Sequence, residues 1–267
     1  MRLLILLGVF LLVSTSSYAD IMNGGFETGD LTNWSVGGTD GNVQVLKSGQ
    51  FASNDGPPPS VKIAAPSGFY YALLSNGAGN SGGAALQTST LTSDPYLVGA
   101  GANISFLLDF FTSEFSTANG GNPDFYDVFV LKAGVPVATL ASGDVDGAQT
   151  TFPTVNCVSV FLVAPDNTTV CSHSTLQPFT NLDLSLYAGS VVQFQFLVSN
   201  AVDNNFDSAL LVDAVHGAGL TDVNALSGVP EPQSWILLLT VAIIVYFTLR
   251  RQLQHRRTSA ASQVEHH

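Results

Sequence analysis

Charged residues, and basic residues above all, are scarce in this chain. Only 10% of its 267 residues are charged, whereas an ordinary soluble domain has about 25%. Between residues 20 and 229, three lysines stand against 18 acidic residues, a balance of −15. Phosphate binding needs clustered basic side chains, so this balance argues against nucleic acid as a partner. It also disfavours anionic polymers, unless cations bridge the two surfaces.

Recognisable catalytic motifs are absent as well. The sequence has no Gly-x-Ser-x-Gly elbow, no His-Glu-x-x-His, no P-loop and no Gly-x-Gly-x-x-Gly that opens a helix. We therefore expect no enzymatic activity. A secreted glycan hydrolase with two catalytic carboxylates is the alternative, but among 18 acids some suitable pair always exists, so composition alone cannot test it.

The two ends of the chain have the patterns of targeting segments. Residues 1–19 place Arg2 before an apolar run and end on Ser-Tyr-Ala, which is the layout of a secretory signal peptide cleaved before Asp20. Residues 233–249 are 17 uncharged residues, and the 250–267 tail after them is rich in arginine. This pattern predicts a transmembrane helix with a cytoplasmic tail and the N-terminus outside.

A Pro-Glu-Pro motif, Pro230, Glu231 and Pro232, stands directly before that helix in the 222–232 spacer. The order of motif, apolar helix and Arg-rich end resembles the PEP-CTERM sorting signal of Gram-negative bacteria. The resemblance implies processing by an exosortase, a membrane transpeptidase-like enzyme. The mature protein would then reach the cell surface or the extracellular matrix.

The region 20–221 has the pattern of a single all-β domain. Short runs rich in Val, Ile, Leu, Phe and Tyr alternate with turn formers, and no segment keeps a 3.6-residue apolar period. We expect an antiparallel β-sandwich of jelly-roll type. The strands are expected at 42–47, 69–75, 84–90, 102–111, 126–132, 135–140, 158–163, 179–185, 191–199 and 209–215. Asp109, Asp124 and Asp127 lie among aromatics that could form a sugar-stacking platform, although alternating aromatics in strands are more often core.

Cys157 and Cys171 are the only cysteines. In an exported domain the expected state is one disulfide between them, which closes a loop worth about 3 kcal/mol in the chain-entropy model. A zinc site with His173 would lack a fourth ligand.

Both ends of the predicted domain carry a further resemblance. The stretch from Asn23 to Glu27 spells NGGFE and Trp34 follows it, while Asp213 stands two residues before Val215 near the other end. This pairing is similar to the opening and closing strands of carbohydrate-binding-module and galactose-binding-like jelly rolls. In that group the first and last strands pair, and a structural Ca²⁺ often lies beside them.

The resemblance implies that Glu27 and Asp213 are carboxylate ligands of Ca²⁺, helped by the backbone carbonyls of Asn23 and Gly25. Oxygen ligands of this kind suit Ca²⁺. A second interpretation stays open, in which Glu27 caps a turn and Asp213 pairs with a backbone donor.

The sequence therefore predicts an exported, exosortase-sorted, non-enzymatic surface or matrix protein, associated with exopolysaccharide or biofilm and binding carbohydrate. A permanently membrane-anchored adhesin, whose tail is never cut, is a further alternative.

Overall fold

The computed structural model describes residues 20–39, 42–49, 64–76, 87–112, 124–145, 150–151, 172–200 and 208–224. The predicted signal peptide, strand 158–163, both cysteines, the Pro-Glu-Pro motif and the C-terminal apolar segment lie outside these ranges. Within the described ranges, no helix has the length and apolar character needed to cross a membrane.

The described part is built from strands, which confirms the all-β prediction. They are β1 (Trp34–Gly37), β2 (Asn42–Lys47), β3 (Tyr70–Ser75), β4 (Thr88–Ser93), β5 (Tyr96–Thr112), β6 (Phe125–Lys132), β7 (Val135–Asp144), β8 (Thr150–Thr151), β9 (Ser172–His173), β10 (Gln177–Asp183), β11 (Val191–Ser199) and β12 (Ser208–Asp222). One 3-10 turn, η4 (Ser185–Tyr187), connects β10 to β11.

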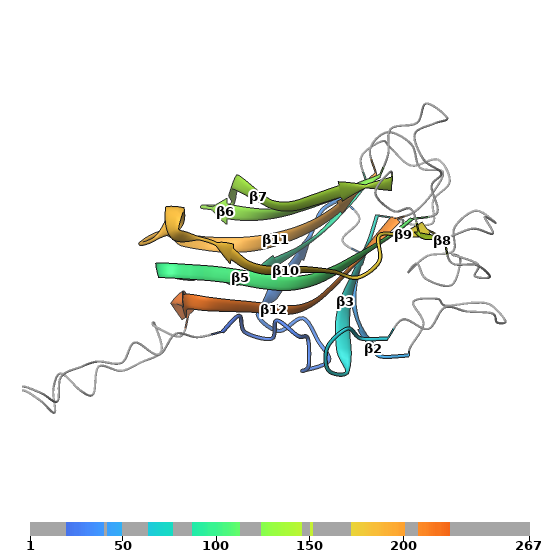
Figure 1. Cartoon of the computed structure of the whole chain (residues 1–267), viewed down its shortest axis with the longest axis horizontal. Coiled ribbons are helices and arrows are strands. Elements are labelled where there is room, and N and C mark those ends of the chain that lie inside the picture. Colours follow the sequence, from blue (N-terminus) through green and yellow to red (C-terminus); the bar gives the residue numbers. More distant parts are fainter. Residues whose placement is uncertain are drawn as a thin grey trace, which may run out of the picture. The chain divides into compact units, whose positions relative to one another are not determined.

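The strands form two antiparallel layers (Figure 1). One layer has the order β1-β4-β11-β6-β7, and the other has the order β10-β5-β12-β3-β2. At one end β11 also pairs with β5, through Val191↔Leu97 and Val192↔Tyr96, so the two layers are continuous there. The predicted antiparallel sandwich is thus present as a nearly closed sheet.

Strict alternation of side chains builds the core between the layers. In β11, Val192, Phe194, Phe196 and Val198 are buried in the core cluster, while Gln193 and its odd-numbered neighbours face the other way. The ring of Phe106 meets Phe196 edge-on at 5.4 Å between centroids and stacks on Phe179 at 5.0 Å. Burying each such side chain contributes about 1.5–3 kcal/mol.

The pairing of β5 with β12 runs from Ser208↔Thr112 to Asp222↔Tyr96, with a register shift between Asp213 and His216. Ala214 has φ +49° at this shift, a left-handed conformation that a non-glycine residue adopts only when its surroundings enforce it. Because one residue is inserted, the inward positions change from even-numbered, as at Val212, to odd-numbered, as at Val215.

Two strands are longer than the sequence indicated. The predicted spans 102–111 and 209–215 extend to Tyr96–Thr112 in β5 and Ser208–Asp222 in β12. Each observed strand contains a glycine that lies outside its predicted span. Gly101 (φ +70°) and Gly219 (φ +72°) lie at irregular points within continuous strands.

Candidate functional site

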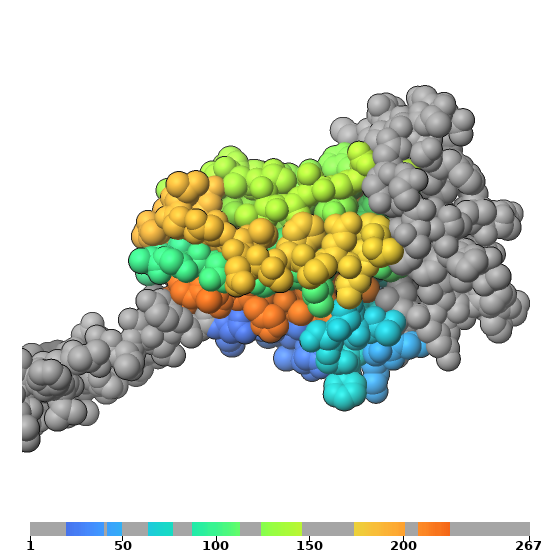
Figure 2. Space-filling view, in the orientation of Figure 1, coloured from blue at the N-terminus to red at the C-terminus, as the bar shows by residue number. Residues whose placement is uncertain are grey.

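The N-terminal segment, residues 20–33, lies against β12 (Figure 2). The backbone N–H of Val215 donates to the carbonyl of Gly24 at 2.9 Å. Asp20 accepts a hydrogen bond from the backbone N–H of Gly217 at 2.8 Å and contacts His216 Nδ1 at 2.9 Å. The opening and closing segments of the domain are therefore adjacent, as the sequence resemblance implied.

The residues of the NGGFE stretch have separate structural roles. A Cβ on Gly24 would overlap the carbonyl of Val215, so only glycine allows this approach. Phe26 is fully buried in the core and packs on Trp34 at 5.5 Å between ring centroids. The Asn23 carbonyl accepts hydrogen bonds from Phe26 N and Trp34 Nε1. This local framework projects Glu27 from the segment.

Glu27 and Asp213, called the acid pair below, both hold the segment that leads into β3. Glu27 Oε1 accepts the backbone N–H groups of Phe69 at 2.8 Å and Tyr70 at 3.1 Å. Asp213 Oδ2 accepts Ser67 N at 2.7 Å, and Oδ1 accepts its neighbour Ala214 N at 2.6 Å. Asp213 does pair with backbone donors, and its partner loop at 67–70 was not predicted from the sequence.

Burial makes one member of the acid pair, Asp213, electrostatically unusual. Desolvation raises the pKa of Asp213 to about 6, although the Ser67 and Ala214 N–H groups oppose the shift and the Glu27 carboxylate adds to it. The Asp213 side chain is fully buried. A cation bound between the buried Asp213 and the exposed Glu27 would stabilise the charged form of Asp213.

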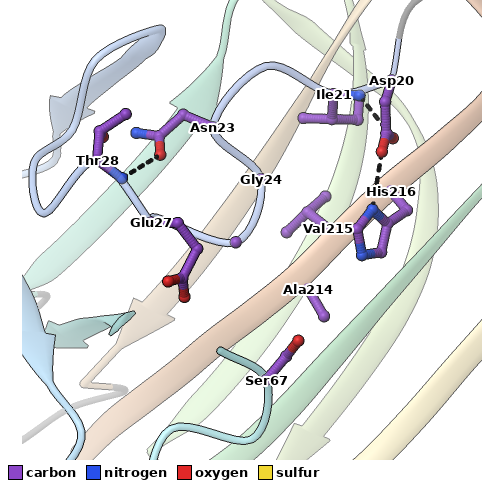
Figure 3. A pocket seen from close by; sticks show the side chains of 11 residues that line it. Asp20, Ile21, Asn23, Gly24, Glu27, Thr28, Ser67, Ala214, Val215 and His216 are labelled. Carbon is purple, nitrogen blue, oxygen red and sulfur yellow. Dashed lines mark hydrogen bonds and ion pairs between the residues drawn. The ribbon is translucent and has the colours of Figure 1, made fainter. Parts of the chain in front are cut away.

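A pocket of about 470 Å³ opens beside the acid pair and is lined by Glu27, Thr28, Ser67, Ala214 and His216, among others. Figure 3 shows Glu27 on the N-terminal segment, Ser67 on the loop before β3, and Ala214, Val215 and His216 along β12. The lining therefore comes from three separate parts of the chain.

The donor set of this pocket fits a hard cation only with help from the backbone and water. Among the described residues, no cluster of three or more His, Cys, Asp or Glu side chains could hold a metal. Of the acid pair, Glu27 lines the pocket together with Gly25, whereas Asp213 is not among the lining residues. Since the Asn23 carbonyl already accepts two hydrogen bonds, Gly25 is the better placed of the two predicted carbonyls.

A second candidate surface is the outer face of the β1-β4-β11-β6-β7 layer. Register places Thr92, Gln195, Phe129 and Thr139 in one row across β4, β11, β6 and β7. Thr92 Oγ1 accepts a hydrogen bond from Gln195 Nε2 at 3.0 Å. All four side chains are at least partly exposed, so amide, hydroxyl and aromatic groups lie side by side on this face.

The next row along the same face contains Leu197, Asp127 and Ser142. Burial raises the pKa of Asp127 above its ordinary value. Phe125 follows, partly exposed, whereas Phe110, Phe111 and Tyr126 are buried. Of the aromatic residues near Asp109, Asp124 and Asp127, Phe125 therefore lies on the outer face. The sequence did not indicate Phe129, because its neighbours on this face are known only from the strand register.

The outer face of the other layer is different. Its side chains Tyr71, Leu73, Phe111, Ala209 and Leu211 are all at most 1% exposed. Their register, Ala209↔Phe111 and Leu211↔Leu73, puts them on one surface that faces away from the main core. This part of the second layer's outer face is therefore closed to solvent, whereas outward residues nearer the start of β5, such as Asn103 and Ser105, are partly exposed.

Replacing Gly68 by alanine tests the close approach of the 67–70 loop to Glu27. Gly68 has φ +62°, and a Cβ there would overlap the Glu27 carboxylate. We expect Gly68→Ala to lower the free energy of unfolding by clearly more than the roughly 1–2 kcal/mol of left-handed strain alone. The matched control is Gly49→Ala, with φ +79° and nothing within 4 Å. Equal losses in thermal melts of the two variants would contradict the packing described for Glu27.

Some solved structures are similar to this chain at low sequence identity. No family model matches the chain, and no curated protein matches it. Similar solved structures include the carbohydrate-binding module TmCBM61 in complex with β-1,4-galactotriose (14% identity, 74% of this chain, 96% of that one, TM-score 0.35). Others are the K3 adhesin domain of Lys-gingipain from Porphyromonas gingivalis W83 (13%, 75% and 99%, 0.38) and a Stig cyclase from Fischerella sp. TAU (16%, 74% and 94%, 0.34).

Proposed function

We propose that the β-domain is a non-enzymatic binding module that attaches the exported protein to neutral polysaccharide through the outer face of the β1-β4-β11-β6-β7 layer. The observation that carries this proposal is the row Thr92, Gln195, Phe129 and Thr139. Sugar rings present an apolar C–H face that stacks on aromatic rings, and hydroxyls that pair with amide, hydroxyl and carboxylate groups.

The negative charge of the domain favours neutral over anionic polysaccharides as ligands. The excess of 15 negative charges between residues 20 and 229 repels anionic chains. Asp127 on the same face is an acceptor for sugar hydroxyls, and it adds to the repulsion of anions. Neutral glycans bind such a surface through hydrogen bonds and stacking, so their retention should depend little on salt.

Truncating Phe129 tests the binding face. We expect Phe129→Ala to weaken retention on a neutral extracellular polysaccharide from the producing cell by about tenfold, since it removes about 1.4 kcal/mol of stacking. Affinity electrophoresis at two salt concentrations measures the effect, with thermal melts to confirm folding. The control is Phe69→Ala, whose side chain is 67% exposed outside this face. If Phe129→Ala binds like the original protein, or if both variants lose binding equally, the face is not the site.

We further propose that the acid pair binds one structural Ca²⁺. Glu27 and Asp213 would hold the ion with the Gly25 carbonyl and water, and the ion would supply positive charge that fixes the N-terminal segment and the 67–70 loop to β12. The support is the convergence of two carboxylates on one loop and the desolvation of Asp213.

Glu27→Gln gives a clean test, because both backbone hydrogen bonds go to Oε1 and an amide oxygen can accept them. Calcium at about 100 times the Kd of the acid pair should stabilise the original protein by about 2.7 kcal/mol more than it stabilises Glu27→Gln. In EDTA the variant should melt no lower than the original, since repulsion of Asp213 is relieved. The control is Asp30→Asn, which also accepts two hydrogen bonds on one oxygen and should keep the calcium gain. A melting temperature that is identical in EDTA and calcium would exclude the ion.

Finally, we propose that the chain is exported and exosortase-sorted, with the apolar segment 233–249 as a temporary membrane anchor. The support is the order of Pro230, Glu231 and Pro232, the apolar segment and the arginines. Release would leave the β-domain on the cell surface or in the extracellular matrix, where it meets polysaccharide.

Intact mass and terminal sequencing of protein recovered from the cell surface and the medium test this sorting. We expect an amino terminus at Asp20 and a carboxyl terminus near Glu231. Retention of Arg257 in the surface protein would show that the tail is not cut and would favour the permanently anchored adhesin.

A further inference from the structure

At one end of the sandwich, the inward-facing positions at the ends of five strands, or directly next to those ends, are polar rather than hydrophobic. This is the end where β9 pairs with the last residues of β5 (Figure 1). Alternation places the five side chains toward the core, since the inward residues two positions along each strand belong to the core cluster. The five residues, called the polar layer below, are Asn76, Thr112, Asp124, Asn200 and Ser208, each at most 1% exposed.

Hydrogen bonds connect the polar layer across both sheets. Asn76 Nδ2 donates to Asp124 Oδ2 at 2.8 Å, and Asn76 Oδ1 accepts Ser208 N at 2.7 Å. Ser208 Oγ donates to Thr112 Oγ1 at 2.8 Å. A carboxylate, an amide and two hydroxyls therefore lie in one continuous network inside the domain.

Asn200 adds an oxygen that the network does not use. The register Ser199↔Phe125 places Asn200 opposite Asp124 on the neighbouring strand, and both side chains point inward. Asn200 is 1% exposed, and its Oδ1 has no hydrogen-bond partner among the described residues. An unsatisfied buried acceptor costs about 1–3 kcal/mol, which a bound ligand that supplies positive charge would recover.

We propose that the polar layer binds a divalent cation of the calcium class between the two sheets, with the Asp124 carboxylate and Asn200 Oδ1 as its principal ligands. The Thr112 and Ser208 hydroxyl oxygens are in the same network. Carboxylate, amide and hydroxyl oxygens are the ligands that Ca²⁺ takes, six to eight of them at about 2.3–2.6 Å. The ion would join the sheets at the end where their hydrophobic contact stops.

This internal site is separate from the acid pair. Ser208 and Asp213 are five residues apart on β12, which is about 17 Å along a strand. They also face opposite sides of their sheet, because Ser208 is in the even-numbered inward series and Asp213 is not. Calcium binding at one site can therefore be removed without touching the ligands of the other.

Native mass spectrometry of the metal-depleted mature protein, titrated with Ca²⁺ alone, counts the ions. We expect two per chain, one in Asp124→Asn and one in Glu27→Gln. The amide oxygen that Asp124→Asn introduces can still accept the Asn76 hydrogen bond, so folding should survive. If the original protein binds one ion that Glu27→Gln keeps and Asp124→Asn loses, the internal site stands and the acid-pair site fails. Loss of the only ion in Glu27→Gln, with Asp124→Asn unaffected, overturns the internal site.

Asn200→Asp tests calcium binding at the internal site even if Asp124→Asn does not fold. A second carboxylate beside Asp124 should tighten calcium binding at the internal site at least tenfold if a cation lies there. In a layer held by hydrogen bonds alone, the added charge would repel Asp124 and lower the melting temperature equally with and without calcium, which overturns the proposal. Asn181→Asp adds the same charge at an exposed position and should leave the affinity unchanged.

Discussion

The pairing of β12 with β5, and the bulge at Ala214 within it, is the constraint on which the rest of the domain depends. Before the bulge, the even-numbered residues Leu210 and Val212 of β12 fill the core, and directly after it the odd-numbered Val215 does. The bulge lets Asp213 point away from the core while Val215, two residues on, points into it and hydrogen-bonds the N-terminal segment at Gly24. A one-residue change of register would exchange these faces.

The pairing of β12 with β5 also positions both ends of the β-domain and its two oxygen-rich clusters. Ser208 begins β12 in the polar layer, Asp213 belongs to the acid pair, and His216 contacts Asp20. The acid pair and the polar layer connect different segments of the sandwich at two separate places. The β1-β4-β11-β6-β7 layer, which has the accessible face, belongs to this connected structure. In the proposed function, side chains already held in place on this face would bind a ligand at low entropic cost.

Much of the fold could be predicted from local patterns, and the sites only in part. The alternation in 191–199 and 42–47 placed β11 and β2 at their observed bounds. The NGGFE stretch and Asp213 indicated which segments meet. Nothing local indicates a left-handed alanine at 214 or the 67–70 loop, because both arise from tertiary packing. The possible roles of Phe129 and Asn200 are visible only from the strand register, which shows their neighbours. In the sequence, each looks like an ordinary strand residue.

A crystal structure of the mature protein with an oligosaccharide released from the producer's own neutral extracellular polymer would test the binding account most directly. The account predicts a sugar ring stacked on Phe129, with hydroxyls within hydrogen-bond distance of Gln195 and Asp127. Sugar bound in the pocket beside the acid pair, with the sheet face bare, would contradict it.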